Sequence, residues 1–397
     1  MSDRLDRLTQ RDEARAGTSE RLGRVVGRGE HTEAPNEPGR PEQRGEHTGA
    51  PDRLGAILAD AVPRVCSAAV ALIAVDGAVA AAAATGELVR YADAEGTLAA
   101  DRPRARRDSI FDLASVSKLF TTAVLLSLAE DGRIALDEPA AAWIPGLDRR
   151  ITLRRLLTHT AGLTPTRRID RELPGADPAE RLAAMVNTPI THPVGGPYLY
   201  SDVGMILAGR LAELAGGAPL DVLVRSRVAD VLGLADTGYR PHALPRVAAT
   251  EWKRERPGPG CVRGEVHDET AYALGGVAGH AGVFATADDL LAFGETLRLS
   301  GGPVLRPESV AEMVRDQGAE GAAFRHGLGV RIGDPATAGP LGGGAYGHSG
   351  FTGTSFVIDP ARRLTVVLLT NAVHPVRGRD GIRDLRHAVA AEALRLA

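Results

Sequence analysis

The segment that carries most information about this chain is Phe111-Asp112-Leu113-Ala114-Ser115-Val116-Ser117-Lys118. Its first residues predict a short strand at 110–113, and the apolar run that continues to Gly132 predicts a buried helix beginning at Ser115. Ser115 and Lys118 are three positions apart, so on this helix they share one face and their side chains lie together. The segment therefore pairs a hydroxyl group with an amine in apolar surroundings.

Lysine is rare in this chain, because only two of the 47 basic residues are lysines. An arginine keeps its proton near neutral pH, whereas a lysine can lose it, which favours Lys118 as a general base. Burial lowers the pKa of a lysine, and the positive end of a helix stabilises an oxyanion, so both effects favour Ser115 as a nucleophile. This segment alone leaves a simpler alternative open, in which Ser115 caps the helix and Lys118 extends to solvent.

The composition is that of an ordinary globular protein, with 397 residues of which 44% are hydrophobic and 24% charged. The net charge of -3, with both signs interspersed, gives no single-sign surface for nucleic acid or a membrane. Cys66 and Cys261 lie far apart without metal-ligand spacing, and no HExxH pattern occurs. We therefore expect no metal, no other cofactor and no nucleic-acid or membrane partner, and the oligomeric state stays open.

Residues 1–52 are rich in Arg, Glu, Gly and Pro and nearly free of large apolar side chains, so we expect a disordered tail. The tail contains a near repeat, at 28–35 and 44–51, and no apolar stretch long enough for a signal peptide. No later segment has the length and apolar character of a membrane span. The sequence therefore predicts a cytoplasmic protein.

Strand-like patterns are concentrated at the two ends of the remaining chain. An amphipathic helix from Leu54 leads to apolar runs at 68–75 and 79–84, which predict a hairpin around Asp76-Gly77. Near the C-terminus, the runs rich in Val, Ile and Leu are 327–332, 355–358 and 364–370, followed by a helix from about 379 to 396.

These patterns predict an α/β protein of the α+β type. We expect an antiparallel sheet built from about 54–114 and 325–397, flanked by helices, with a mostly helical region of about 119–300 inserted between its two halves. The junction of sheet and helical region is the expected place for a cleft and a site.

Four segments resemble motifs of the serine β-lactamase and penicillin-binding protein superfamily, closest to class C β-lactamases and related carboxylesterases. The segment 111–118 resembles the nucleophile motif, and 156–163 (Leu-Leu-Thr-His-Thr-Ala-Gly-Leu) resembles a recurrent family motif. Tyr198-Leu199-Tyr200-Ser201-Asp202 matches the tyrosine motif, and Gly347-His348-Ser349-Gly350-Phe351 stands where a Lys-Thr-Gly or His-Thr-Gly motif lies on an edge strand. The resemblance implies a β-lactamase/transpeptidase-like fold and one serine hydrolase domain over 53–397.

The resemblance also implies roles for particular residues. Ser115 would be the acylated nucleophile, with Lys118 and Tyr200 sharing its proton and delivering one to the leaving group. A tyrosine can do this if neighbouring positive charge lowers its pKa. The backbone N–H groups of Ser115 and Phe351 would form the oxyanion hole. A buried core position remains the alternative for Tyr200.

The same resemblance makes His348, Ser349 and Gly350 the far wall of the pocket. Two positions depart from the β-lactamase pattern, since Asp202 stands where class C enzymes usually have Asn and His348 where they have Lys. A largely neutral imidazole binds a substrate carboxylate more weakly than lysine does, so we expect an uncharged or weakly charged acyl group and inefficient β-lactam hydrolysis. Asp202 would hold Lys118 charged, which shifts the role of base to Tyr200.

The other glycine-rich run, 275–282, matches no dinucleotide or phosphate motif. The resemblance places a similar segment beside the site, so His280 either lines the pocket or belongs to a structural turn, and we favour the turn. We expect His159 to hold a loop by hydrogen bonding. Residues 164–197, with six prolines, form either a substrate-selecting lid or a long surface loop.

The leading hypothesis is a cofactor-free serine hydrolase that forms an acyl-enzyme at Ser115 from a small ester or amide and releases the acyl group to water. The alternative is a cytoplasmic transacylase of specialised metabolism, which passes the acyl group from an ester to an amine or alcohol. A third possibility is a catalytically silent binding protein. The complete set of Ser115, Lys118 and Tyr200 argues against silence.

Overall fold

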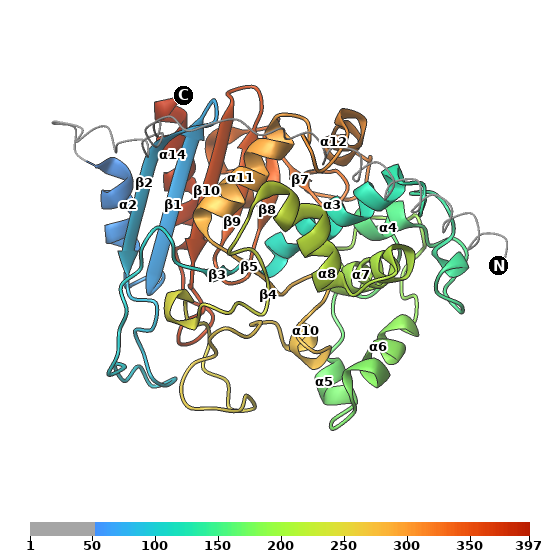
Figure 1. Cartoon of the computed structure of the whole chain (residues 1–397), viewed down its shortest axis with the longest axis horizontal. Helices are drawn as coiled ribbons and strands as arrows, with labels where there is room; N and C mark the ends of the chain where they lie inside the picture. The colour runs from blue at the N-terminus through green and yellow to red at the C-terminus, as the bar shows by residue number, and fades with distance from the viewer. Residues whose placement is uncertain (1–51) are drawn as a thin grey trace, which may run out of the picture. The chain divides into compact units, whose positions relative to one another are not determined.

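The computed structural model describes residues 52–397 and contains the antiparallel sheet expected from the two chain ends (Figure 1). Seven strands are hydrogen-bonded in the order β2-β1-β10-β9-β8-β7-β6, and each neighbouring pair is antiparallel. The strands are β1 (Ala68–Val75), β2 (Ala78–Gly86), β6 (Arg325–His326), β7 (Arg331–Ile332), β8 (Tyr346–Ser349), β9 (Ser355–Asp359) and β10 (Leu364–Thr370). The expected fold class is confirmed.

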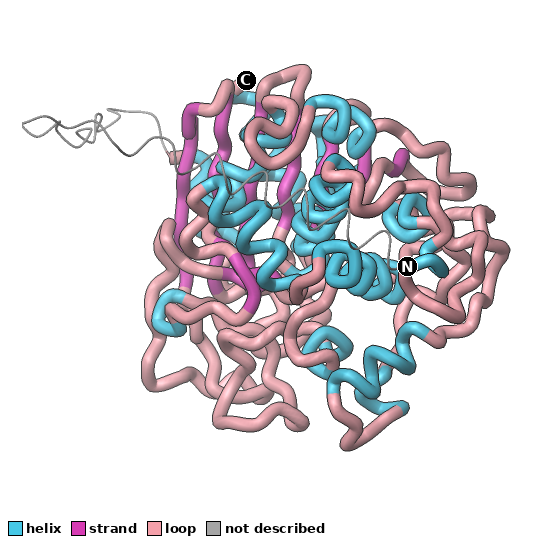
Figure 2. Tube along the Cα trace, turned by 45° about the vertical axis from the view of Figure 1, so that its right-hand side comes forward, coloured by secondary structure: helices cyan, strands magenta, loops and turns pink. Residues whose placement is uncertain are grey.

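The sheet has a hydrophobic core on each face, because alternate side chains of a strand point to opposite sides. On β1, Val70 and Leu72 belong to the larger core, which contains the apolar side chains of α11 (Ala287–Arg298). Ala71 and Ile73 belong to a second core with α2 (Arg53–Ala61) and α14 (Ile382–Leu396). Figure 2 shows these helices on the two sides of the strands.

The region between the sheet halves is built around α3 (Ser117–Glu130), which is buried almost all round and packs against α7 (Asp202–Gly216). A small antiparallel sheet accompanies it, in the order β3 (Phe111–Asp112), β5 (Val283–Ala285) and β4 (Gly238–Tyr239). The other α-helices are α4 (Leu153–Leu157), α5 (Ile169–Glu172), α6 (Pro178–Val186), α8 (Leu220–Val224), α9 (Asp230–Leu232), α10 (Glu269–Ala273), α12 (Pro307–Val314) and α13 (Pro335–Ala338).

Several details differ from the expectations. The expected strand at 327–332 is wrong, because Gly329 has a φ of +67° and the chain turns there between β6 and β7. The strand predicted at 110–113 belongs to the small sheet, since β3 pairs with β5. The helix α11 covers the main sheet although it lies within 119–300. The stretch 164–197 is no plain loop, because it contains α5 and α6.

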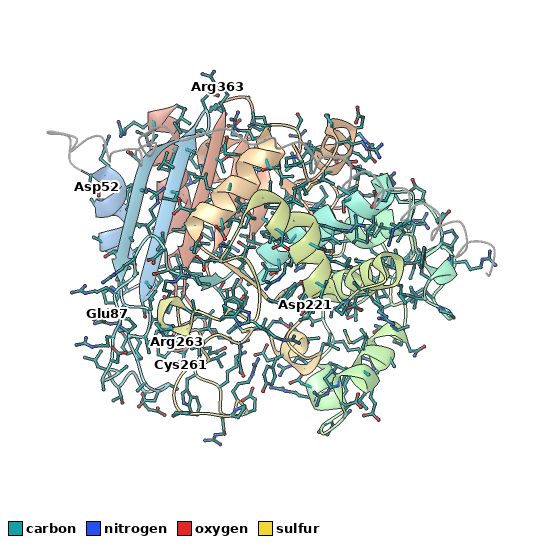
Figure 3. The ribbon with its side chains drawn as sticks, viewed as in Figure 1. Asp52, Glu87, Asp221, Cys261, Arg263 and Arg363 are labelled. Carbon is teal, nitrogen blue, oxygen red and sulfur yellow. The ribbon has the colours of Figure 1, made fainter. Side chains whose placement is uncertain are left out.

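The expected tail lies outside the described residues except for Asp52, which caps α2 by accepting the Gly55 N–H at 2.8 Å (Figure 3). Within residues 52–397 no single helix is long and apolar enough to cross a membrane. Only α7 together with Leu220–Leu232 reaches that length and composition, as a pair bent by 76°. Cys66 and Cys261 form no disulfide.

Candidate active site

Ser115 lies in a tight turn that a buried carboxylate holds in place. Residues Ala114–Val116 form a single 3-10 turn, and α3 begins at Ser117 rather than at Ser115 as expected. Ala114 has a φ of +46°, a conformation that costs energy for a residue with a Cβ. Asp112 Oδ1 accepts the Ala114 N–H at 2.8 Å, and its Oδ2 accepts the His267 N–H at 2.7 Å. Asp112 therefore fixes the strained turn that presents Ser115.

Two side chains donate hydrogen bonds to the Ser115 hydroxyl group. Lys118 Nζ donates to Ser115 Oγ at 2.9 Å, and Tyr200 Oη donates to the same oxygen at 3.0 Å. Lys118 is fully buried, which excludes the alternative in which it extends to solvent. Tyr200 directly precedes the N-cap of α7, and the Ser201 N–H donates to His159 Nδ1 at 3.1 Å. The expected loop-holding role of His159 thus has a specific hydrogen bond.

Lys118 is held as an ammonium ion by its surroundings. Its Nζ lies 2.9 Å from Asp202 Oδ1 and donates to the His280 carbonyl oxygen at 3.1 Å. Burial is the largest single influence and lowers the pKa of Lys118, but the charge of Asp202, together with Tyr200, outweighs it and raises the pKa above the usual lysine value. Burial thus acts in the expected direction, and the carboxylate of Asp202 outweighs it, in line with the expectation that Asp202 holds Lys118 charged.

The segment after β8 is fastened to the nucleophile turn. Thr352 Oγ1 donates to the carbonyl oxygen of Asp112 at 2.8 Å, and Thr354 Oγ1 donates to that of Leu113 at 3.0 Å. A Cβ atom added to Gly350 would lie 2.5 Å from the Leu113 oxygen, so the two segments approach more closely than a side chain permits. This packing holds Gly350, the residue before Phe351, against the turn that carries Ser115. The oxyanion role of the Ser115 and Phe351 N–H groups stays a prediction.

The wall formed by β8 carries no cation at the motif position. His348 is buried, and its Nδ1 donates to the Ser349 carbonyl oxygen at 2.8 Å. Burial, reinforced by the charges of Arg331 and Lys118, lowers the pKa of His348 well below its usual value. The imidazole is therefore neutral near pH 7, as the sequence led us to expect. Ser349 Oγ lies 3.1 Å from Thr337 Oγ1.

His280 takes part through its backbone and not through its ring. Its carbonyl oxygen accepts from Lys118, whereas its ring Nε2 lies 2.9 Å from Asp268 Oδ1 and away from the nucleophile. The neighbouring Gly279 carbonyl oxygen accepts from Thr121 Oγ1 at 2.9 Å. The segment is thus a structural turn that supports Lys118, which is the interpretation favoured from the sequence.

One charged residue beside the site was missed in the sequence. The guanidinium carbon of Arg331, on β7, lies 5.1 Å from the ring centroid of Tyr200, and Lys118 Nζ lies 5.0 Å from that centroid. Arg331 Nη1 donates to Asp334 at 3.1 Å. In a chain with so many arginines, no composition or spacing marks this one, and only the pairing of β7 with β8 shows its place.

A metal centre has no support in the part of the chain that the structure describes, where no group of three or more His, Cys, Asp and Glu side chains could hold an ion. His267 and Asp268, the nearest candidates in the sequence, bond to Glu251 and His280 instead.

Comparison with known proteins agrees with this geometry. The family model described as "Beta-lactamase" matches residues 66–391. An Escherichia coli K12 protein, whose name assigns it to the D-alanyl-D-alanine carboxypeptidases, is 32% identical over 320 residues, covering 70% of this chain and 73% of its own. The structure of EstCE1, described as a hydrolase with promiscuous acyltransferase activity, has a TM-score of 0.65 at 26% identity, with 84% of this chain and 97% of EstCE1 covered.

A second solved structure has a similar fold. The octameric penicillin-binding protein homologue from Pyrococcus abyssi has a TM-score of 0.66 at 21% identity, covering 87% of this chain and 77% of its own. The family expected from the motif resemblance is confirmed by the match of the family model. The chain therefore belongs to the Beta-lactamase family, within the superfamily of serine β-lactamases and penicillin-binding proteins.

Proposed function

We propose that this protein cleaves a small ester or amide with an uncharged or weakly charged acyl group, through an acyl-enzyme at Ser115. The observation that carries the proposal is the pair of hydrogen bonds to Ser115 Oγ, at 2.9 Å from Lys118 and 3.0 Å from Tyr200. A hydroxyl group held between an ammonium ion and a phenol has both a source of positive charge and a partner for its proton.

In the proposed reaction, the Tyr200 hydroxyl proton turns from Ser115 toward the leaving group, and Ser115 Oγ attacks the acyl carbonyl carbon. Tyr200 Oη takes the Ser115 proton as it gives its own proton to the leaving oxygen or nitrogen, whose bond to the carbonyl carbon breaks, so Tyr200 is a neutral phenol before and after the step. Lys118 keeps its proton and offsets the negative charge that develops on Oγ, since Asp202 holds it charged. The N–H groups of Ser115 and Phe351 receive the carbonyl oxygen. In the second half of the reaction, water attacks the carbonyl carbon of the acyl-enzyme, the bond to Ser115 Oγ breaks, and Tyr200 passes a proton from the water to Ser115.

A transacylase is the second candidate. EstCE1, described as a hydrolase with promiscuous acyltransferase activity, is similar to this chain over 97% of its length, which supports testing amine and alcohol acceptors. The name of the Escherichia coli relative supports testing another donor, a peptide that ends in D-alanyl-D-alanine. The neutral His348 favours the ester donors over such a peptide, whose carboxylate prefers a cation at that position.

The test is intact-mass analysis of the protein incubated with p-nitrophenyl esters, nitrocefin and a D-alanyl-D-alanine peptide, each with and without an amine acceptor. We expect an acyl adduct that is lost in Ser115→Ala and kept in Ser127→Ala, a matched change at the far end of α3. Aminolysis faster than hydrolysis would favour the transacylase. The absence of an adduct and of turnover with all of these donors would leave a binding protein as the remaining interpretation.

A further inference from the structure

An exposed aromatic ring stands at the edge of the site. Phe351 follows the His348-Ser349-Gly350 motif, and 61% of its surface is exposed. Among the large apolar side chains most exposed within residues 52–397, it is the only aromatic one. A lone exposed apolar residue is common and needs no explanation by itself. What distinguishes Phe351 is its place directly after Gly350, which packs against the turn that carries Ser115, and the way in which its ring is supported.

Two side chains that are far apart in the sequence lie against the ring of Phe351. The ring centroid of His267 lies 5.8 Å away at an interplanar angle of 21°, and the guanidinium carbon of Arg377 lies 5.4 Å from the Phe351 centroid. His267 is buried, and its backbone N–H donates to Asp112, the residue that fixes the nucleophile turn. The ring thus has a fixed position relative to Ser115, and it leaves most of its area open.

The supporting side chains are themselves held in an ion-pair network. Arg377 Nε donates to both carboxylate oxygens of Glu251 at 2.8 Å, and His267 Nε2 lies 2.9 Å from the same carboxylate. Lys253 Nζ donates to Glu269 Oε1 at 2.7 Å and to the His267 carbonyl oxygen at 2.6 Å. The two cations of this network are balanced by its two carboxylates. The surface next to Phe351 therefore offers an apolar ring without a net charge.

The leaving group and the acyl group must lie on different sides of Ser115. In the proposed reaction the leaving group lies at Tyr200, whose hydroxyl group protonates it. The ring contacts of Phe351 are with His267 and Arg377, whereas the ring of Tyr200 lies against His159 and His348. The two rings therefore have different surroundings, and we assign Phe351 to the side away from the leaving group. The substituent that can reach the Phe351 ring is therefore the acyl chain.

We propose that Phe351, supported by His267 and Arg377, forms a binding surface for a planar apolar acyl group, and that the protein prefers arylacyl donors over short alkyl donors. The proposal rests on the proposed acyl-enzyme chemistry and names its donor class. Stacking of one ring on another adds binding beyond the area buried, and the neutral network below the ring imposes no charge on the acyl chain.

The experiment compares p-nitrophenyl phenylacetate with p-nitrophenyl acetate, which share a leaving group. We expect kcat/KM to favour the phenylacetyl donor, and this preference to fall about 10-fold in Phe351→Ala and by a smaller factor in Phe351→Leu, which keeps apolar bulk without a ring. Val376→Ala, a change of an exposed neighbour, is the control and should keep the preference. Thermal melting by circular dichroism checks that each variant is folded.

An unchanged preference in both Phe351 variants, with acyl-Ser115 still formed, would overturn the binding surface and leave the proposed function intact. Calorimetry measures the affinity of each donor for Ser115→Ala and for Ser115→Ala/Phe351→Ala. These variants lack the nucleophile, so the measurement reports binding without turnover. Tighter binding of the phenylacetyl donor that depends on Phe351 supports the proposal even where no acyl-enzyme forms. Equal binding of both donors to both proteins refutes it.

Discussion

Replacement of Asp202 by asparagine tests the role of the buried ion pair. At the 2.9 Å between Lys118 Nζ and Asp202 Oδ1, Coulomb's law with an effective dielectric constant of about 20 gives roughly 6 kcal/mol. An amide oxygen in the same place keeps a polar contact with the ammonium group that is worth about 2–3 kcal/mol. We therefore expect Asp202→Asn to lower the free energy of unfolding by about 3 kcal/mol at pH 7, in line with the loss of a buried charge partner.

The pH dependence separates this cause from a general loss of packing. The folded wild type raises the pKa of Lys118, so the stabilisation is fully present below the unfolded value of about 10.4 and is lost only as pH rises through the folded pKa. In Asp202→Asn, burial is unopposed and the folded pKa falls below the unfolded one. The stability of the variant then rises with pH up to about 10, and the gap between the two proteins narrows.

Urea denaturation at pH 7, 8.5 and 10 measures this gap. Asp137→Asn is the control, because its ion pair with Arg154 lies at the surface, where 69% of the Asp137 side chain is exposed, and should cost less than about 1 kcal/mol. Acylation should change as well, since a lysine that loses its proton adds an alkaline rise to the rate profile of Asp202→Asn. A constant gap across the pH range, or equal stability at pH 7, would refute the ion-pair account.

Three further predictions concern the nucleophile and its supports. Gly350→Ala should lower acylation by at least about 100-fold and cost about 1–3 kcal/mol of stability, because its Cβ would lie 2.5 Å from the Leu113 carbonyl oxygen; retained kinetics would contradict this packing. Lys118→Arg should abolish acylation and lower the melting temperature, since the fully buried site has no room for a guanidinium group; near-wild-type activity would disprove it. The acylation rate should show no histidine titration between about pH 6 and 8, because the pKa values of His348 and His159 are both well below the usual value. An inflection in that range that is lost in His348→Asn would contradict a neutral His348.

The sequence predicted those features that depend on local pattern. The apolar runs on either side of Asp76-Gly77 predicted the hairpin, and the run at 364–370 matches β10 at both ends. The order of the motifs identified Ser115, Lys118 and Tyr200 as a set, and the structure brings their side chains together. Local apolar content misled at 327–332, where a glycine with positive φ outweighs the β propensity of its neighbours.

Features that depend on three-dimensional neighbours were beyond such reasoning. The sequence brought Asp202 to Lys118 only through the family resemblance, because the carboxylate is 84 positions away in the chain, and the 2.9 Å between the two groups comes from the fold. The placement of Arg331 against Tyr200 depends on the register of two short strands. The Phe351 surface depends on ion pairs within residues 251–269 and between that segment and Arg377 near the C-terminus.

The second lysine of the chain explains why lysine is kept at both positions. Lys253 is nearly as buried as Lys118, and its Nζ lies among three oxygens, 2.6 Å from the His267 carbonyl oxygen, 2.7 Å from Glu269 and 3.7 Å from Glu251. Lys118 Nζ also lies among three oxygens, those of Ser115, Asp202 and His280. An ammonium group offers three donors around one compact centre, whereas a guanidinium group is larger and planar.

This shared geometry changes the interpretation of the rare lysines. The sequence favoured loss of a proton as the reason for keeping Lys118, yet its pKa is raised, while burial lowers that of Lys253 against the pull of Glu269. Two lysines with pKa shifts of opposite direction share only their burial and their three oxygen neighbours. Size and donor geometry therefore exclude arginine from both positions, and in the proposed reaction Lys118 acts as a fixed positive charge beside Ser115, with Tyr200 as the group that moves the proton.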